Sequence, residues 1–161
     1  EIRLSLVGSE MCIRDRSRMT DSNLSVGTDV VHIPSFADQL ALPGTRFARV
    51  FSAAELRVAQ ARGLEGAPRA HHLAGRWAAK EAFIKAWSQA LYGFPPVLDE
   101  EAVTWSDIEV RPDAWGRVAL ELRGDIATAV QQTLGNHTTA LSISHDGDYA
   151  TATVILSRLS Q

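Results

Sequence analysis

Cysteine is almost absent, because Cys12 is the only one among 161 residues. An internal disulfide cannot form, and a zinc site built from cysteines is excluded. The sequence also lacks any run near the ~18 consecutive apolar residues of a membrane-spanning helix, and a net charge of −3 argues against bulk electrostatic binding of nucleic acid. We therefore expect a cytoplasmic protein that contacts neither membrane nor nucleic acid.

Internal repeats and low-complexity tracts are absent as well, and the length suits one domain. The first 18 residues differ in character from the rest. Their apolar run, Leu4 to Val7, is too short for a signal peptide, and Met19 reads as a natural start. We expect residues 1–18 to be a non-native or disordered leader and residues 19–161 to be the domain. Deleting the leader should leave activity intact.

Local patterns alternate between strand and helix. Strands are predicted over residues 26–33, 108–111, 118–122, 138–144 and 149–156, and helices over 35–41, 53–62, 69–91 and 125–134. Ser52 and Glu55 form a capping box at the start of the second helix. The last two strands form a hairpin around Gly147. This order predicts a single α+β domain in which one long buried helix packs on a mainly antiparallel sheet.

The long helix carries charge where an apolar surface is expected. Its large apolar residues form one stripe and its alanines cover most of the remaining surface, yet four charged residues are set into it: Arg76, Lys80, Glu81 and Lys85. Burying unpaired charges costs several kcal/mol each. One interpretation is a surface helix with an ion pair between Glu81 and Lys85. The other is a site where the cations bind phosphates and the carboxylate holds Mg²⁺.

The first strand contains a second misplaced charge. Alternation puts Asp29 on the same face as Val31 and Ile33. This carboxylate either accepts a buried hydrogen bond or acts as a second metal ligand facing Glu81. Two carboxylates suit Mg²⁺, which fills its other positions with water and substrate phosphate oxygens.

Three histidines remain open to two interpretations. His145 lies between Ser144 and Asp146 at the end of a strand, and such crowding is not typical of a catalytic triad, whose members come from separate parts of a fold. It is either a structural or solvated side chain or a functional one. His71 and His72 either contact phosphate or contact nothing, and adjacent histidines do not form a metal motif on a helix.

Five segments together resemble the holo-acyl-carrier-protein synthase family of short phosphopantetheinyl transferases, in its actinobacterial branch. In chain order they are Gly27-Thr28-Asp29-Val30-Val31, Arg49-Val50-Phe51-Ser52 with Glu55, Leu73 to Ala82 with Ile84-Lys85-Ala86, Asp107-Ile108-Glu109-Val110 with Gly116, and Ser142 to Asp146. The motif of the long helix is the specific one. The resemblance covers residues 26–157 and implies the phosphopantetheinyl transferase fold.

The resemblance implies transfer of the 4′-phosphopantetheine group of coenzyme A to a serine of apo acyl carrier protein, or of a carrier domain, in fatty acid biosynthesis. Adenosine 3′,5′-bisphosphate would leave. Asp29 and Glu81 would bind Mg²⁺ together with the pyrophosphate. Glu81 would also accept the proton, directly or through a water on the metal, and Lys85 would act beside it.

The resemblance also implies that Arg76, His72 and His145 contact the nucleotide or its phosphates and that Lys80 neutralises phosphate charge. Members of this length are typically trimers with the active site between subunits, so a homotrimer is expected. Two alternatives stay open, namely a non-catalytic module that binds coenzyme A or a nucleotide and a structural trimer without a ligand. Asp29→Asn should spare binding in the first, and Glu81→Gln should mainly alter stability in the second.

Two positions depart from the family's pattern. The first helix, SFADQLAL, has no basic residue to bind an acidic carrier, which leaves Arg46 and Arg49 as the nearest candidates. Reversing both charges should raise the KM for the carrier without changing the affinity for coenzyme A. His32 stands where an acidic residue is common, so a third carboxylate near the metal is not expected.

Overall fold

The structure is a computed structural model that describes residues 23–98 and 100–159, so the expected leader lies outside the described residues. Its elements, in chain order, are β1 (Leu24–His32), α1 (Ile33–Ala41), η2 (Phe47–Val50), α2 (Ala53–Ala61), α3 (Gly66–Ala90), η3 (Glu100–Ala102), η4 (Trp105–Asp107), β2 (Ile108–Pro112), β3 (Val118–Leu122), α4 (Gly124–Leu134), β4 (His137–Asp146) and β5 (Tyr149–Arg158). The predicted α+β class is confirmed.

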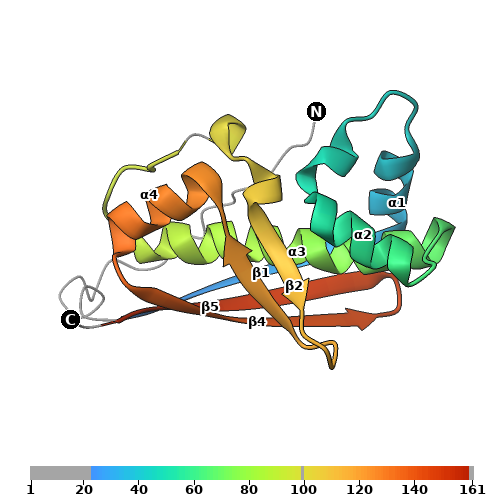
Figure 1. The fold of residues 1–161 in the computed structure, drawn as a ribbon. Helices are drawn as coiled ribbons and strands as arrows, with labels where there is room; N and C mark the ends of the chain where they lie inside the picture. Colours follow the sequence, from blue (N-terminus) through green and yellow to red (C-terminus); the bar gives the residue numbers. More distant parts are fainter. Residues whose placement is uncertain (1–22, 99, 160–161) are drawn as a thin grey trace.

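Two antiparallel sheets form the β part of the fold. The larger sheet has the strand order β1-β5-β4, and β2 pairs with β3 in a separate two-stranded sheet. In the larger sheet Asp29 lies opposite Ala152, and Ser142 lies opposite Thr153. The long helix α3 runs across one face of this sheet, with β2, β3 and α4 beyond it (Figure 1). Helix α3 is therefore the centre of the domain.

Strand β1 lies directly against α3. Its burial alternates, so Ser25, Gly27, Asp29 and Val31 face the helix while the residues between them face outward. A Cβ atom at Gly27 would overlap the backbone of α3 at Ala82 and Ala86. Glycine is required here by the close approach of strand and helix, and this contact fixes where Asp29 lies along α3.

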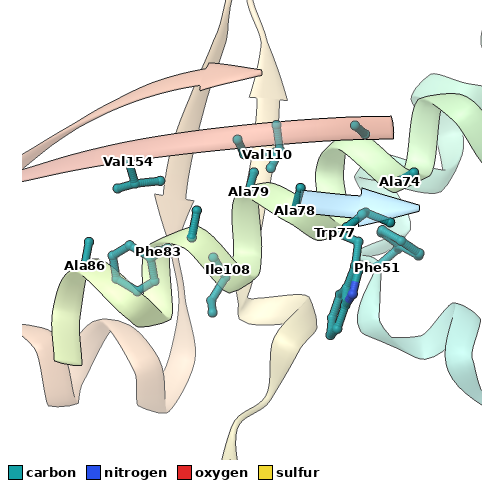
Figure 2. Close-up of a cluster of buried hydrophobic side chains, with 14 of the residues drawn as sticks. Phe51, Ala74, Trp77, Ala78, Ala79, Phe83, Ala86, Ile108, Val110 and Val154 are labelled. Atoms are coloured by element: carbon teal, nitrogen blue, oxygen red, sulfur yellow. The ribbon is translucent and has the colours of Figure 1, made fainter. Parts of the chain in front are cut away.

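The core surrounds α3 on several sides. Figure 2 shows Val154 of β5 on one side of the helix, and Ile108 and Val110 of β2 beside it. Phe83, Ala78 and Ala82 of α3 are completely buried. The many alanines of α3 let strands approach its backbone closely, which explains why the helix lacks an ordinary polar face. The prediction of a buried long helix is confirmed.

Most element boundaries lie close to the predicted ones, and the starts of α3 and α1 show the most informative differences. Helix α3 begins at Gly66 rather than near residue 69. Pro68 is tolerated there because the amide groups of a helix's first turn have no partner within the helix. Ile33, predicted on the face of the first strand, begins α1 instead, and Pro34 occupies the first turn. None of the described helices is long and apolar enough to span a membrane.

Candidate active site

Asp29 and Lys85 form the ion pair that joins β1 to α3. Lys85 Nζ lies 2.7 Å from Asp29 Oδ1, with the lysine side chain 42% exposed and the aspartate 10%. The other carboxylate oxygen, Oδ2, is buried and has no hydrogen-bond partner among the residues that the structure describes. A buried carboxylate oxygen without a donor is unfavourable, so this atom is suited to a ligand such as a cation.

Glu81 lies one helical turn before Lys85, which places both residues on the same face of α3. Within residues 23–98 and 100–159, no group of three or more His, Cys, Asp and Glu side chains is arranged to hold a metal. Mg²⁺ does not require such a group, because one or two carboxylates together with substrate phosphates are its usual ligands. Asp29 and Glu81 would supply these carboxylates, and the buried Asp29 Oδ2, which has no hydrogen-bond partner within the described residues, is suited to an ion.

Two of the residues predicted to bind the nucleotide, His72 and Arg76, lie nearer the start of α3. His72 and Arg76 are both buried, and within residues 23–98 and 100–159 His72 Nε2 has no hydrogen-bond partner. Burial and the charge of Arg76 lower the pKa of His72 to about 4. Burial, together with the charge of Arg62, lowers the pKa of Arg76 to about 10. His72 is thus neutral at pH 7 and stands beside two cations.

His145 reaches this region from the end of β4. Its ring stacks on His71 with centroids 4.2 Å apart, and its Nε2 lies 3.0 Å from the His71 carbonyl oxygen. Burial and His71 lower the pKa of His145. Gly75 makes room for this arrangement, since a Cβ atom there would lie 2.8 Å from His145 Nε2. The structure therefore brings His145 to the same part of α3 as His72 and Arg76.

Lys80 departs from the expectation that it neutralises phosphate charge. Its side chain is fully buried, and Nζ donates to Glu55 Oε2 at 2.9 Å, to the Trp105 carbonyl at 3.0 Å and to the Ile108 carbonyl. All three ammonium protons are used inside the protein. The structure thus gives Lys80 an internal role that ties α3 to α2 and to the start of β2.

Glu55 is the partner that the sequence pattern did not reveal. The capping box predicts that the Glu55 carboxylate accepts a hydrogen bond from the Ser52 backbone N–H, and this bond forms at 2.8 Å. The same carboxylate also accepts from Val110 N at 3.0 Å and from Lys80. Only the three-dimensional packing shows that one side chain serves both as a cap and as a buried counterion.

A separate pocket of about 560 Å³ lies between η2, the start of α2 and the η4–β2 segment. Phe51 and Leu56 contribute apolar walls, and Arg49, Asp107 and Arg123 line the pocket with charge. Neither Asp29 nor Lys85 lines it. Arg49, one of the two basic residues expected to contact a carrier, therefore belongs to this pocket rather than to the ion pair of β1 and α3.

Comparison with known proteins identifies the family. Residues 25–154 match the profile of the 4′-phosphopantetheinyl transferase superfamily. The chain is 62% identical over 133 residues to the holo-[acyl-carrier-protein] synthase of Corynebacterium glutamicum (strain R), covering 83% of this chain and 97% of that protein. It is 45% identical to the synthase of Mycobacterium tuberculosis (strain ATCC 25177 / H37Ra), covering 83% and 95%.

Solved structures show the same similarity. The complex of the synthase from Chronobacterium ammoniagenes with coenzyme A has a TM-score of 0.81 and 57% identity, covering 85% of this chain and 98% of that one. The acyl carrier protein synthase of Mycobacterium tuberculosis has a TM-score of 0.63 and 37% identity, covering 84% and 97%. On this evidence the chain belongs to the 4′-phosphopantetheinyl transferase superfamily.

Proposed function

We propose that this chain transfers the 4′-phosphopantetheine group of coenzyme A to a serine of apo acyl carrier protein, releasing adenosine 3′,5′-bisphosphate. Relatives at 62% identity are named holo-[acyl-carrier-protein] synthases, and a structure with 57% identity is a complex with coenzyme A. The observation that carries the proposal is the ion pair of Asp29 and Lys85. In the described part of the chain, the second carboxylate oxygen of Asp29 is buried without a hydrogen-bond partner, next to a helix that carries several cations.

Asp29 and Glu81 are the residues that would hold Mg²⁺. Bound there with the substrate, the ion would neutralise charge on the pyrophosphate. Lys85, 42% exposed, adds a positive charge that can reach both Asp29 and a phosphate. Arg76, His72 and His145 would bind the nucleotide part of coenzyme A farther towards the start of α3.

The transfer is a substitution at phosphorus. The serine oxygen of the carrier attacks the phosphorus atom that bears the pantetheine arm, and the bond from this phosphorus to the bridging oxygen breaks. Adenosine 3′,5′-bisphosphate leaves with the electron pair of that bond. Glu81 accepts the serine proton, and Lys85 stabilises the charge on the leaving phosphate. Positioning and charge neutralisation supply most of the rate enhancement in reactions of this kind.

The carrier is a free protein or a domain of a fatty acid synthase. Helix α1 has no basic residue in its last turn, which supports Arg46 and Arg49 as the charges that contact an acidic carrier. Arg49 lines the pocket between η2 and β2, where apolar walls are also available. We expect carrier binding to depend on both kinds of contact.

The expected homotrimer would use the outer face of the larger sheet. Five large apolar residues on this face are exposed: Leu24, Val26, Val30, Tyr149 and Ile155. Apolar residues that gather on one uncovered sheet face are typical of an interface. A neighbouring subunit would cover these residues. We expect the assembled protein to act in the cytoplasm.

One experiment tests the transfer directly. The protein is incubated with coenzyme A, Mg²⁺ and an apo carrier, and the carrier is weighed by mass spectrometry. We expect the added mass of one phosphopantetheine group, and no addition when Mg²⁺ is chelated. A carrier of unchanged mass, despite tight binding of coenzyme A, would favour the non-catalytic module.

A further inference from the structure

The side of α3 that meets β1 is built from small residues. A Cβ atom added at Gly27 would overlap the helix backbone at Ala82 and Ala86, and both alanines are completely buried. Neighbouring elements usually fix the rotation of a helix through side chains that fit as ridges into grooves. Alanine and glycine form only shallow ridges, so the contact with β1 constrains the rotation of α3 weakly. A directional contact on another side of the helix can supply this constraint.

Lys80 makes such a directional contact. Its fully buried Nζ donates to Glu55 Oε2 at 2.9 Å, to the Trp105 carbonyl at 3.0 Å and to the Ile108 carbonyl. The three acceptors come from three different elements, α2, η4 and β2. A buried ammonium group with three fixed acceptors tolerates little displacement, because each lost hydrogen bond would leave a buried charge less well satisfied.

The carboxylate on the other side of this contact is also fixed. The Glu55 side chain is 1% exposed, and it accepts hydrogen bonds from Ser52 N at 2.8 Å and from Val110 N at 3.0 Å. Both donors are backbone groups, which cannot rotate away as a side chain can. A buried polar network whose members are all satisfied is rigid. Lys80 is therefore held, directly or through Glu55, by the backbone of the elements that pack on α3.

This contact lies directly beside the candidate active site. Glu81 follows Lys80 in the helix, and Lys85 lies five residues, or ~7.5 Å, farther along the axis. Side chains of an α-helix reach ~5–6 Å from its axis, so a rotation of ~20° would move their ends by ~2 Å. A misplacement of ~1 Å can lower the rate of an enzyme by about 100-fold. The rotation of α3 therefore decides whether Glu81 reaches the position that the transfer requires.

We propose that the pair of Lys80 and Glu55 is a positioning element, which fixes the rotation of α3 and thereby places Glu81 and Lys85 against Asp29. This rests on the proposed function, with Asp29 and Glu81 as the ligands of Mg²⁺. Lys80 acts through Glu81 and touches neither the substrate nor the metal. Apolar residues of similar volume often replace a buried ion pair without loss of stability, but they provide no directional contact.

The test separates positioning from stability by comparing the unaltered protein, the double variant Lys80→Met with Glu55→Gln, and Ile126→Ala. Ile126 is a core residue of α4 that is 1% exposed, so its truncation destabilises the protein without removing a member of the pair. Calorimetry gives the dissociation constant of Mg²⁺ in the presence of saturating coenzyme A. The transfer assay gives kcat and the KM for the apo carrier, at a temperature at which all three proteins are folded.

We expect the folded double variant to bind Mg²⁺ about tenfold more weakly and to have a kcat lower by about 10- to 100-fold, as is typical when a group that orients a metal ligand is lost. The KM for the carrier should change less than twofold. Ile126→Ala should keep all three values. If the double variant does not fold, Glu55→Gln replaces it, because glutamine keeps an acceptor for the Ser52 N–H, and it should shift the Mg²⁺ affinity in the same direction.

Three results would overturn the proposal. Unchanged Mg²⁺ affinity and kcat in the folded variant would make the pair purely structural. A lower kcat with unchanged Mg²⁺ affinity would show that the loss does not pass through Glu81, and equal losses in Ile126→Ala would show that any destabilisation has this effect. Failure of the proposed function is distinguishable: the unaltered protein would then transfer nothing, while the Mg²⁺ affinities would still decide whether the pair positions Glu81.

Discussion

Lys85 Nζ lies 2.7 Å from Asp29 Oδ1 and links the middle of the longest helix to the first strand. The contact leaves the second oxygen of Asp29 buried and without a hydrogen-bond partner in the part of the chain that the structure describes. A lysine alone therefore does not complete the coordination of this carboxylate. A divalent cation bound with a phosphate would engage the remaining oxygen, and the 42% exposed lysine could then contact the substrate.

Replacing Asp29 with Asn should lower the transfer rate by about 100-fold or more, because a neutral amide binds Mg²⁺ poorly and cannot hold Lys85 in place. The Mg²⁺ concentration that gives half the maximal rate should rise as well. Asp38→Asn, which changes an exposed aspartate of α1, is the control and should keep the original Mg²⁺ dependence. An active Asp29→Asn protein with unchanged metal dependence would refute the assigned ligand.

The buried pair of Lys80 and Glu55 should behave as a structural unit. Lys80→Met alone leaves Glu55 buried without its counterion, so the free energy of unfolding should fall by about 3–5 kcal/mol. The double variant Lys80→Met with Glu55→Gln should recover a large part of this loss, since no uncompensated charge remains. Denaturant unfolding of the single and double variants measures the coupling. Independent, additive losses would show that the two side chains do not act together.

The sequence was sufficient for the fold because its local signals agree with the packing. The capping box at Ser52 does start α2, and the alternation that put Asp29 on the buried face of the first strand is present in β1. The alanine-rich helix was correctly expected to be buried, since no polar stripe remained to face water. These signals are local and do not depend on partners distant in the chain.

The site was less predictable because charge pairing is a long-range property. Lys80 pairs with Glu55, which lies 25 positions earlier, and Lys85 pairs with Asp29, which lies 56 positions earlier. Helical periodicity predicts on which face of the helix Lys80 and Lys85 lie, but it does not predict which carboxylate each lysine pairs with. The sequence therefore predicts Lys80 at a phosphate, whereas in the structure Lys80 is buried and donates its hydrogen bonds to Glu55 and to two backbone carbonyl groups.

Stability should depend on pH through His72. In the unfolded chain this histidine binds a proton below pH ~6.5, while in the folded protein burial and Arg76 lower its pKa to about 4. The unfolded state therefore binds more protons between these values, and stability falls as the pH drops through that window, by up to ~3 kcal/mol.

The measurement compares the free energy of unfolding of the unaltered protein and of His72→Phe from pH 4 to pH 8. Phenylalanine keeps a ring of similar shape but does not titrate, so the difference between the two proteins should change between pH ~6.5 and ~4 and stay constant above pH ~7. A difference that is constant over the whole range would mean that His72 accepts a proton as easily in the folded protein as in the unfolded one.

Gly27 and Gly75 should differ in their tolerance of alanine. Neither has a positive φ, so the cost is purely steric. At Gly27 the added Cβ atom meets backbone of α3, which cannot move away without separating helix and strand, and we expect a loss of about 3 kcal/mol or more in unfolding free energy. At Gly75 it meets the side chains of His145 and Ile143, which can rotate, so the loss should be about 1–2 kcal/mol. Equal losses would contradict the backbone contact.

The outer face of the larger sheet should hold the subunits together. Val30 of β1 is 60% exposed and Ile155 of β5 is 43% exposed, although the two strands pair with each other in the larger sheet. Introducing Asp at both positions would place charges in an apolar contact, so the complex should dissociate to single chains and lose activity. Sedimentation velocity measures the change in mass.

The matched control for that experiment is Val97→Asp, a valine outside the sheet that is 43% exposed, as Ile155 is, and this change should leave both mass and activity unchanged. Each single chain keeps Asp29, Lys85 and Glu81 after dissociation, so a loss of activity in the double variant would mean that a neighbour completes the site. If the unaltered protein instead sediments as one chain and still transfers phosphopantetheine, the shared active site is wrong, and the apolar face must serve another partner.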